Sequence, residues 1–141
     1  MAQRINFEVA NRPVNATAAG VTAINGNSYD MQDFEGIVFI CAMGTLTATQ
    51  VTNLKAQQST DNATWADITN AATANAADAD SNKLLVLDVY RPQQRYVRPV
   101  VNRATANAVI DGVIAIRYGE KKLPTTQPTA DVSQSKVTLG V

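Results

Sequence analysis

Apolar and polar residues alternate with a period of two along much of this chain, whereas helical periodicity is weak. Successive side chains of a β-strand point to opposite faces, so this alternation predicts strands. Residues 36–43, GIVFICAM, are apolar on both faces, which is typical of a strand in the middle of a sandwich. Further strong candidates are residues 83–90, 95–101 and 109–118. We predict an all-β fold, a jelly roll or another β-sandwich of about seven to nine short strands.

Weaker patterns surround these strands. Residues 5–9 form a short candidate strand, and Pro13, which lacks an amide hydrogen, predicts that this element is an edge strand or an arm. The pair Asn25-Gly26 predicts a tight turn, because both residues tolerate positive φ. Residues 45–59 are either one strand with a wet face or two strands broken near Thr52-Asn53.

The chain is long enough for one domain with its own core. We therefore predict a single β-sandwich domain over residues 1–141, with residues 1–13 and 120–141 as extended arms. Residues 69–82 are a low-complexity loop of Ala, Asn, Thr and Asp that can add little to a core. Gly112 marks a bulge or a close backbone approach within its strand.

The composition excludes several kinds of chemistry. The chain has no histidine and one cysteine, which removes Ser-His-Asp and Cys-His catalysis, His-ligated zinc and an internal disulfide. Residues 78–82, DADSN, begin like a calcium loop, but Lys83 and Val89 stand where its glycine and its bidentate glutamate are needed. We expect no enzyme activity, no cofactor and no metal, and we place Cys41 in the core as an inert thiol.

The charge balance limits the partners. The formal net charge is +0 at pH 7, so a global field that would gather nucleic acid or an anionic membrane is missing. No segment approaches the roughly 18 consecutive apolar residues of a membrane span, and the start has no apolar core of signal-peptide length. We expect a soluble protein, made in the cytoplasm, with no direct nucleic acid partner and no membrane partner.

Arginine is concentrated in one segment that carries no acidic residue, at Arg91, Arg95, Arg98 and Arg103. A guanidinium binds carboxylates bidentately and stacks on rings, so such a cluster suits a protein interface. Alternatively, these arginines solvate strand ends or pair with the chain's own aspartates, and contact with nucleic acid is the least favoured interpretation. Pro92 and Pro99 each remove a donor, which hints that the second strand lies at or near a sheet edge.

The single tryptophan, Trp65, is flanked by small residues, and we predict that it fills part of the core. The alternative is a carbohydrate-binding module in which aromatic rings stack on sugars. Its candidate platforms are Trp65 with Tyr29, Tyr90, Tyr96 or Tyr118.

One part of the chain resembles a known family. The block KLLVLDVYRPQQRYVRPVVNRATANAVIDGVIAIRYGEKK, with LKAQQSTDNATWADI upstream, is similar to the cement, or decoration, proteins of tailed bacteriophages. The resemblance extends over residues 55–122 and consists of strands with characteristic turn residues. It contains no catalytic signature, and no contact residue can be transferred from the family.

The resemblance implies a jelly-roll homodimer whose partner is the major capsid protein. It implies a place on the outer surface of the virion, often at two-fold positions of an icosahedral shell, after assembly in the bacterial host cytoplasm. The arginine cluster as the capsid interface is our own inference from the residues. A tail or head-completion protein of the virion is a further alternative.

Overall fold

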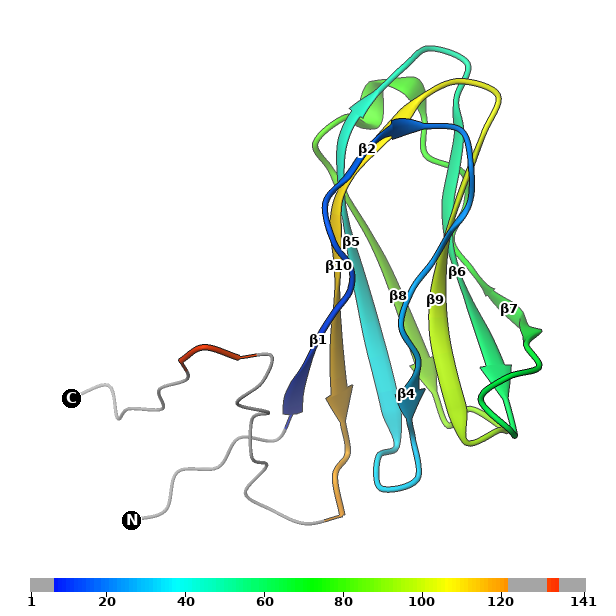
Figure 1. Ribbon diagram of the computed structural model, residues 1–141, viewed down its shortest axis with the longest axis vertical. Helices are drawn as coiled ribbons and strands as arrows, with labels where there is room; N and C mark the ends of the chain where they lie inside the picture. Colours follow the sequence, from blue (N-terminus) through cyan, green and yellow to red (C-terminus); the bar gives the residue numbers. More distant parts are fainter. Residues whose placement is uncertain (1–6, 122–131, 135–141) are drawn as a thin grey trace.

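The computed structural model describes residues 7–121 and 132–134 and contains two antiparallel sheets packed face to face (Figure 1). Sheet A contains β1 (Phe7–Val14), β2 (Thr17–Gly20), β5 (Gly36–Leu46), β8 (Leu84–Tyr90) and β10 (Ala108–Tyr118). Sheet B contains β3 (Ile24–Asn25), β4 (Tyr29–Asp30), β6 (Val51–Ser59), β7 (Ala66–Ala72) and β9 (Tyr96–Ala104). A short 3-10 helix, η1, covers Asp78–Asp80. The all-β sandwich is therefore confirmed.

The strand order places several strands that follow one another in the sequence in different layers. Sheet A has the order β1-β10-β5-β8, with β2 also paired to β10. Sheet B has the order β3-β9-β6-β7, with β4 also paired to β9. The two strands around the arginine-rich joint, β8 and β9, thus belong to opposite sheets (Figure 1).

The core lies between the sheets and follows the period-two pattern. Strand β5 directs Ile37, Phe39, Cys41 and Met43 inward, and alternate residues of β6, β9 and β10 face them. Full burial of a side chain of this size stabilises the fold by about 1.5–3 kcal/mol. Cys41 is 0% exposed, as predicted, and burial raises the pKa of its thiol to about 12, with a smaller contribution from Asp111.

Two turn predictions are wrong. Asn25 ends β3, and neither it nor Gly26 has positive φ. A glycine is needed at position 26 for another reason, because a Cβ there would approach the ring of Pro99 to 2.7 Å. The break between β5 and β6 falls at residues 47–50 rather than near Thr52-Asn53, and Thr49 takes the positive φ.

Pro99 does not mark a sheet edge, which corrects the prediction made from the prolines. Its strand, β9, lies between β6 on one side and β3 with β4 on the other. The carbonyl of Pro99 accepts a hydrogen bond from the amide of Gly26, between the end of β3 and the start of β4. Since the amide and carbonyl of an antiparallel residue point to the same side, the missing donor faces an interruption in the neighbouring strand.

Other expectations concern the chain ends and β10. The first element is predicted to be an edge strand or an arm. Phe7–Val14 forms an edge strand, β1, which pairs with β10. Residues 1–6 and most of the predicted C-terminal arm, 122–131 and 135–141, lie outside the described residues. Gly112 has φ +143 and sits at a register shift between β10 and β5, so the predicted bulge is confirmed.

Candidate interaction surfaces

Arg91 and Arg95 lie at one end of the sandwich, and we call them the arginine rim. Arg91 has positive φ, and its Nη2 is 3.4 Å from Glu35 Oε1. Arg95 holds Asp30 through two hydrogen bonds, Nε–Oδ1 at 3.1 Å and Nη2–Oδ2 at 2.7 Å. The bond from Arg95 lowers the pKa of Asp30. Both arginines thus pair with the chain's own acids, yet their side chains remain 68% and 50% exposed.

Arg98 belongs to the outer face of sheet B and not to the rim. Its Nε and Nη2 donate to Gln57 Oε1 at 2.9 and 2.7 Å, and its guanidinium lies 4.4 Å from the centroid of the Trp65 ring. Burial lowers the pKa of Arg98. Trp65 is only half-buried under this arginine and is not part of the core cluster, so the prediction that it fills the core is wrong.

Arg103 is enclosed, with 6% of its surface exposed. Its guanidinium donates to the carbonyl oxygens of Thr22, Ala18 and Ala108 at 2.8–2.9 Å. These bonds tie the loop before β3, strand β2 and strand β10 together at one end of the sandwich. Arg103 therefore has a structural role, and we leave it out of any surface offered to a partner.

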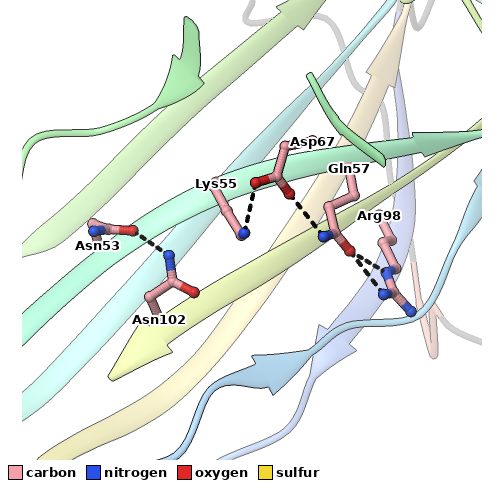
Figure 2. Close-up of polar contacts among 6 residues, drawn as sticks. All are labelled: Asn53, Lys55, Gln57, Asp67, Arg98 and Asn102. Carbon is pink, nitrogen blue, oxygen red and sulfur yellow. Dashed lines mark hydrogen bonds and ion pairs between the residues drawn. The ribbon is translucent and has the colours of Figure 1, made fainter. Parts of the chain in front are cut away.

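The outer face of sheet B carries a polar network (Figure 2). Asp67 accepts from Lys55 Nζ at 2.9 Å and from Gln57 Nε2 at 2.8 Å, and Gln57 in turn accepts from Arg98. The hydrogen bond from Gln57, followed by that from Lys55, lowers the pKa of Asp67. Asn102 donates to Asn53 at 2.8 Å. We call these six residues the polar network: Asn53, Lys55, Gln57, Asp67, Arg98 and Asn102.

The outer face of sheet A carries an apolar patch. Leu84 and Val86 of β8 are 60% and 56% exposed, and Ile114 of β10 is 42% exposed. Between them in β5, Ile40 pairs with Val86 on one side and with Ile114 on the other. We call these four residues, Leu84, Val86, Ile40 and Ile114, the apolar face. Contiguous exposed apolar surface on a folded chain marks a site of interaction.

A polar pair lies at the border of the apolar face. The hydroxyl of Tyr118 donates to Asp88 Oδ1 at 2.5 Å. Burial and this hydrogen bond raise the pKa of Tyr118. The ring of Tyr118 lies where a Cβ of Gly36 would be, so a side chain at position 36 would displace it. The border of the face is therefore fixed by one glycine and one tyrosine.

The aromatic side chains do not form one open platform for sugars. One ring face is covered by an arginine in three cases: Trp65 by Arg98, Tyr90 by Arg91 and Tyr96 by Arg95. Tyr29 is buried and bonds to Asn11. A small open pocket lies between β7 and the β8–β9 joint, and it is lined by Gln58, Ile68, Thr69, Val89, Tyr90, Arg91, Pro92 and Gln93.

Residues 7–121 and 132–134 contain no group of three or more Cys, Asp or Glu side chains placed to hold a metal ion. In the same ranges, no helix has the length and apolar character that a membrane crossing requires. No protein-family model matches the sequence, and no curated protein matches it either.

The arginine segment shows which signals the sequence carried. It suggested one shared surface for the four arginines, but it could not reveal that Arg98 lies over Trp65 on the outer face of sheet B or that Arg103 is enclosed further along β9. The apolar face was missed as a surface. Its signal was present in LLVLDVY, where Leu84 and Val86 occupy alternate positions to the buried Leu87 and Val89.

Proposed function

We propose that this chain is a structural virion protein, a cement or decoration protein of a tailed bacteriophage. In this role it binds the outer surface of an icosahedral head as a dimer and stabilises contacts between subunits of the major capsid protein. The similarity of residues 55–122 to that family supports the proposal. The observation that carries it is that one sandwich exposes both an apolar face and an arginine rim, the surfaces of a protein that binds other proteins.

We propose further that the sandwich is a jelly roll. The strand pairs are nested around the β6–β7 turn, because β5 pairs with β8, β3 and β4 pair with β9, and β1 and β2 pair with β10. A long antiparallel hairpin that is rolled up so that its pairs alternate between two sheets has this order. Jelly rolls of this kind occur in viral capsid proteins and in lectins.

The physics of a cement protein agrees with these surfaces. A dimer that engages two identical shell sites makes its second contact at an effective concentration that can reach about millimolar. Moderate contacts, such as those of the arginine rim with carboxylates of a shell, then suffice for firm attachment. Binding to the assembled shell alone stabilises the shell by mass action.

The test uses purified shells with and without the chain. We expect shells that carry the chain to withstand a higher temperature before disruption, and stripped shells to regain this resistance when the chain is added back. Replacing Arg91 and Arg95 together by alanine should weaken rebinding while the far-UV β signature persists. The matched control is Lys83→Ala, which removes an equally exposed cation that pairs with Asp80 at 2.7 Å.

Equal disruption temperatures with and without the chain, or no rebinding, would refute the proposal. Rebinding that is unchanged in the double alanine variant would mean that the rim arginines serve only their internal partners, Glu35 and Asp30. The copy number per particle tests the place in the virion, because a cement protein is present in hundreds of copies and a tail or head-completion protein in a handful.

A further inference from the structure

The apolar face is a central row of aliphatic side chains with polar groups around it. Val86, Ile40 and Ile114 lie side by side on three adjacent strands. Asp88, which bonds to Tyr118, lies on one side of the row along the strands, and Asp111 of β10 lies on the other side. An apolar centre with a hydrated polar rim is the usual anatomy of a protein interface.

The apolar face is compact. Leu84 and Val86 lie two residues apart on β8, about 7 Å at about 3.3 Å per residue, and three adjacent strands span about 10 Å between their outer axes. Aliphatic surface that stays in contact with water is unfavourable, and its burial stabilises a contact in proportion to the area removed from water. The exposure of Leu84, Val86 and Ile114 is thus a cost that association would remove.

The charge distribution indicates which partner fits. In a two-fold contact each copy presents the same surface, so the centre of that surface must not repel itself. The row of Val86, Ile40 and Ile114 carries no charge and meets this condition. The arginine rim would bring like charges together, which suits a different, carboxylate-bearing partner.

The position of Ile114 indicates how two copies would meet. Ile114 is two strands away from β8, so pairing of β8 edges would leave it exposed. Stacking of one sheet face on another, at the usual spacing of about 10 Å, would cover the whole row at once. Face-to-face stacking therefore accounts for all of the exposed aliphatic side chains of sheet A, whereas edge pairing accounts for those of β8 alone.

We infer that the apolar face is the contact between two copies of this chain, formed by stacking of sheet A on sheet A around a two-fold axis. This inference deepens the dimer in the proposed function and rests on it. It divides the surface into two parts with different partners: the apolar face binds a second copy, and the arginine rim stays exposed to the shell.

The test is sedimentation of the full chain over a range of concentrations. We expect a dimer for the unchanged chain and monomers for Ile114→Lys at the same concentration. The dimer Kd should rise by about 100-fold or more, because each substitution occurs twice in the contact and introduces an unpaired charge. The control is Val21→Lys, which places the same charge at another exposed aliphatic position, 46% exposed, outside sheet A.

Each outcome supports or overturns the inference. A monomeric Ile114→Lys chain with an unchanged β signature and melting curve, next to a dimeric Val21→Lys chain, supports it. An Ile114→Lys chain that stays dimeric overturns it, and protection of β8 amides from hydrogen exchange in that dimer would identify edge pairing instead. An unchanged chain that is monomeric at about 100 μM and still binds shells overturns the inference and the dimer of the proposed function, whereas the binding to the shell stands. A dimer that binds no shell refutes the proposed function alone.

Discussion

The two outer faces of the sandwich follow the same alternation of inward and outward residues but differ in the side chains that they expose. On sheet B, the outward side chains bond to one another, as in the chain of contacts from Lys55 through Asp67 and Gln57 to Arg98 (Figure 2). On sheet A, the outward side chains Leu84, Val86 and Ile114 are aliphatic and remain exposed. The outward side chains of sheet B find partners within the chain, whereas the aliphatic side chains of sheet A stay in contact with water.

This difference shows where to look for a partner in a β-sandwich. A polar network whose groups already have partners gains little from a new contact, because each broken hydrogen bond must be replaced. Exposed aliphatic side chains break no hydrogen bond when a partner covers them, and their burial stabilises the contact by about 25 cal/mol for each Å² removed from water. The contact between two copies of this chain is therefore expected on the less polar of its two faces.

The largest expected effect concerns the polar network. Arg98→Ala removes two hydrogen bonds to Gln57 and the stacking over Trp65. We expect a loss of about 1–3 kcal/mol in the free energy of unfolding, measured in urea. Arg98→Lys keeps the charge but not the planar guanidinium, so its free energy of unfolding should lie between those of the unchanged chain and of Arg98→Ala. A loss below about 0.5 kcal/mol would mean that the network contributes little to stability.

The next effect concerns the border of the apolar face. Tyr118→Phe removes the hydrogen bond to Asp88 and should cost about 0.5–1.5 kcal/mol at pH 7. Because the folded pKa of Tyr118 is raised, its contribution is complete below the unfolded value of about 10 and is lost as the pH rises beyond it. Unfolding at pH 7 and at pH 10.5 should therefore show a smaller difference between the two chains at the higher pH. If the free energies of unfolding of the two chains differed by the same amount at both pH values, Tyr118 would not be the group whose ionisation is suppressed in the folded chain.

A smaller effect is expected for the acid of the polar network. The pKa of Asp67 is lowered, so its contribution is present above the unfolded value of about 3.9 and is lost as the pH falls through the folded value. Asp67→Asn should cost no more than about 1 kcal/mol at pH 7, since the carboxylate is exposed. Thermal melts at pH 7 and at pH 2 test this, and the two chains should become equal at the lower pH.

The smallest effect is expected on the apolar face itself. Leu84→Ser should change the free energy of unfolding by about 0.5 kcal/mol or less, because Leu84 is 60% exposed. The measurement requires a concentration at which the unchanged chain is monomeric, so that association does not contribute. A loss above about 1 kcal/mol would show that this side chain is packed within its own chain, and the contrast between the two faces would fail.

The period-two pattern predicted the sheets well because burial acts on alternate residues of every strand. Cys41 and the bulge at Gly112 followed from the chemistry of single residues. The position of Trp65 did not, because it depends on Arg98 of another strand, which covers the ring. Pro99 misled for a related reason: the interruption in the neighbouring strand that accommodates it involves residues far away in the sequence.

For the candidate site too, the sequence pattern did not reveal contacts between distant residues, as the arginine segment shows. Sequence identified four cations close together, whereas the topology places them in a rim, a network and an enclosed site. Arg103 in particular became a donor to three carbonyl groups, a role that no local pattern indicates. Topology, which depends on contacts between distant residues, decides which neighbours in the sequence remain neighbours in space.

The buried thiol of Cys41 makes this chain a convenient object for labelling. Burial raises the pKa of this thiol to about 12, so the reactive thiolate is scarce at pH 7, and the sulfur is enclosed as well. A cysteine introduced at an exposed position would therefore react with a maleimide dye almost alone, without removal of the native residue. Fluorescence from such a single label could count the copies on one particle and report the distance between them.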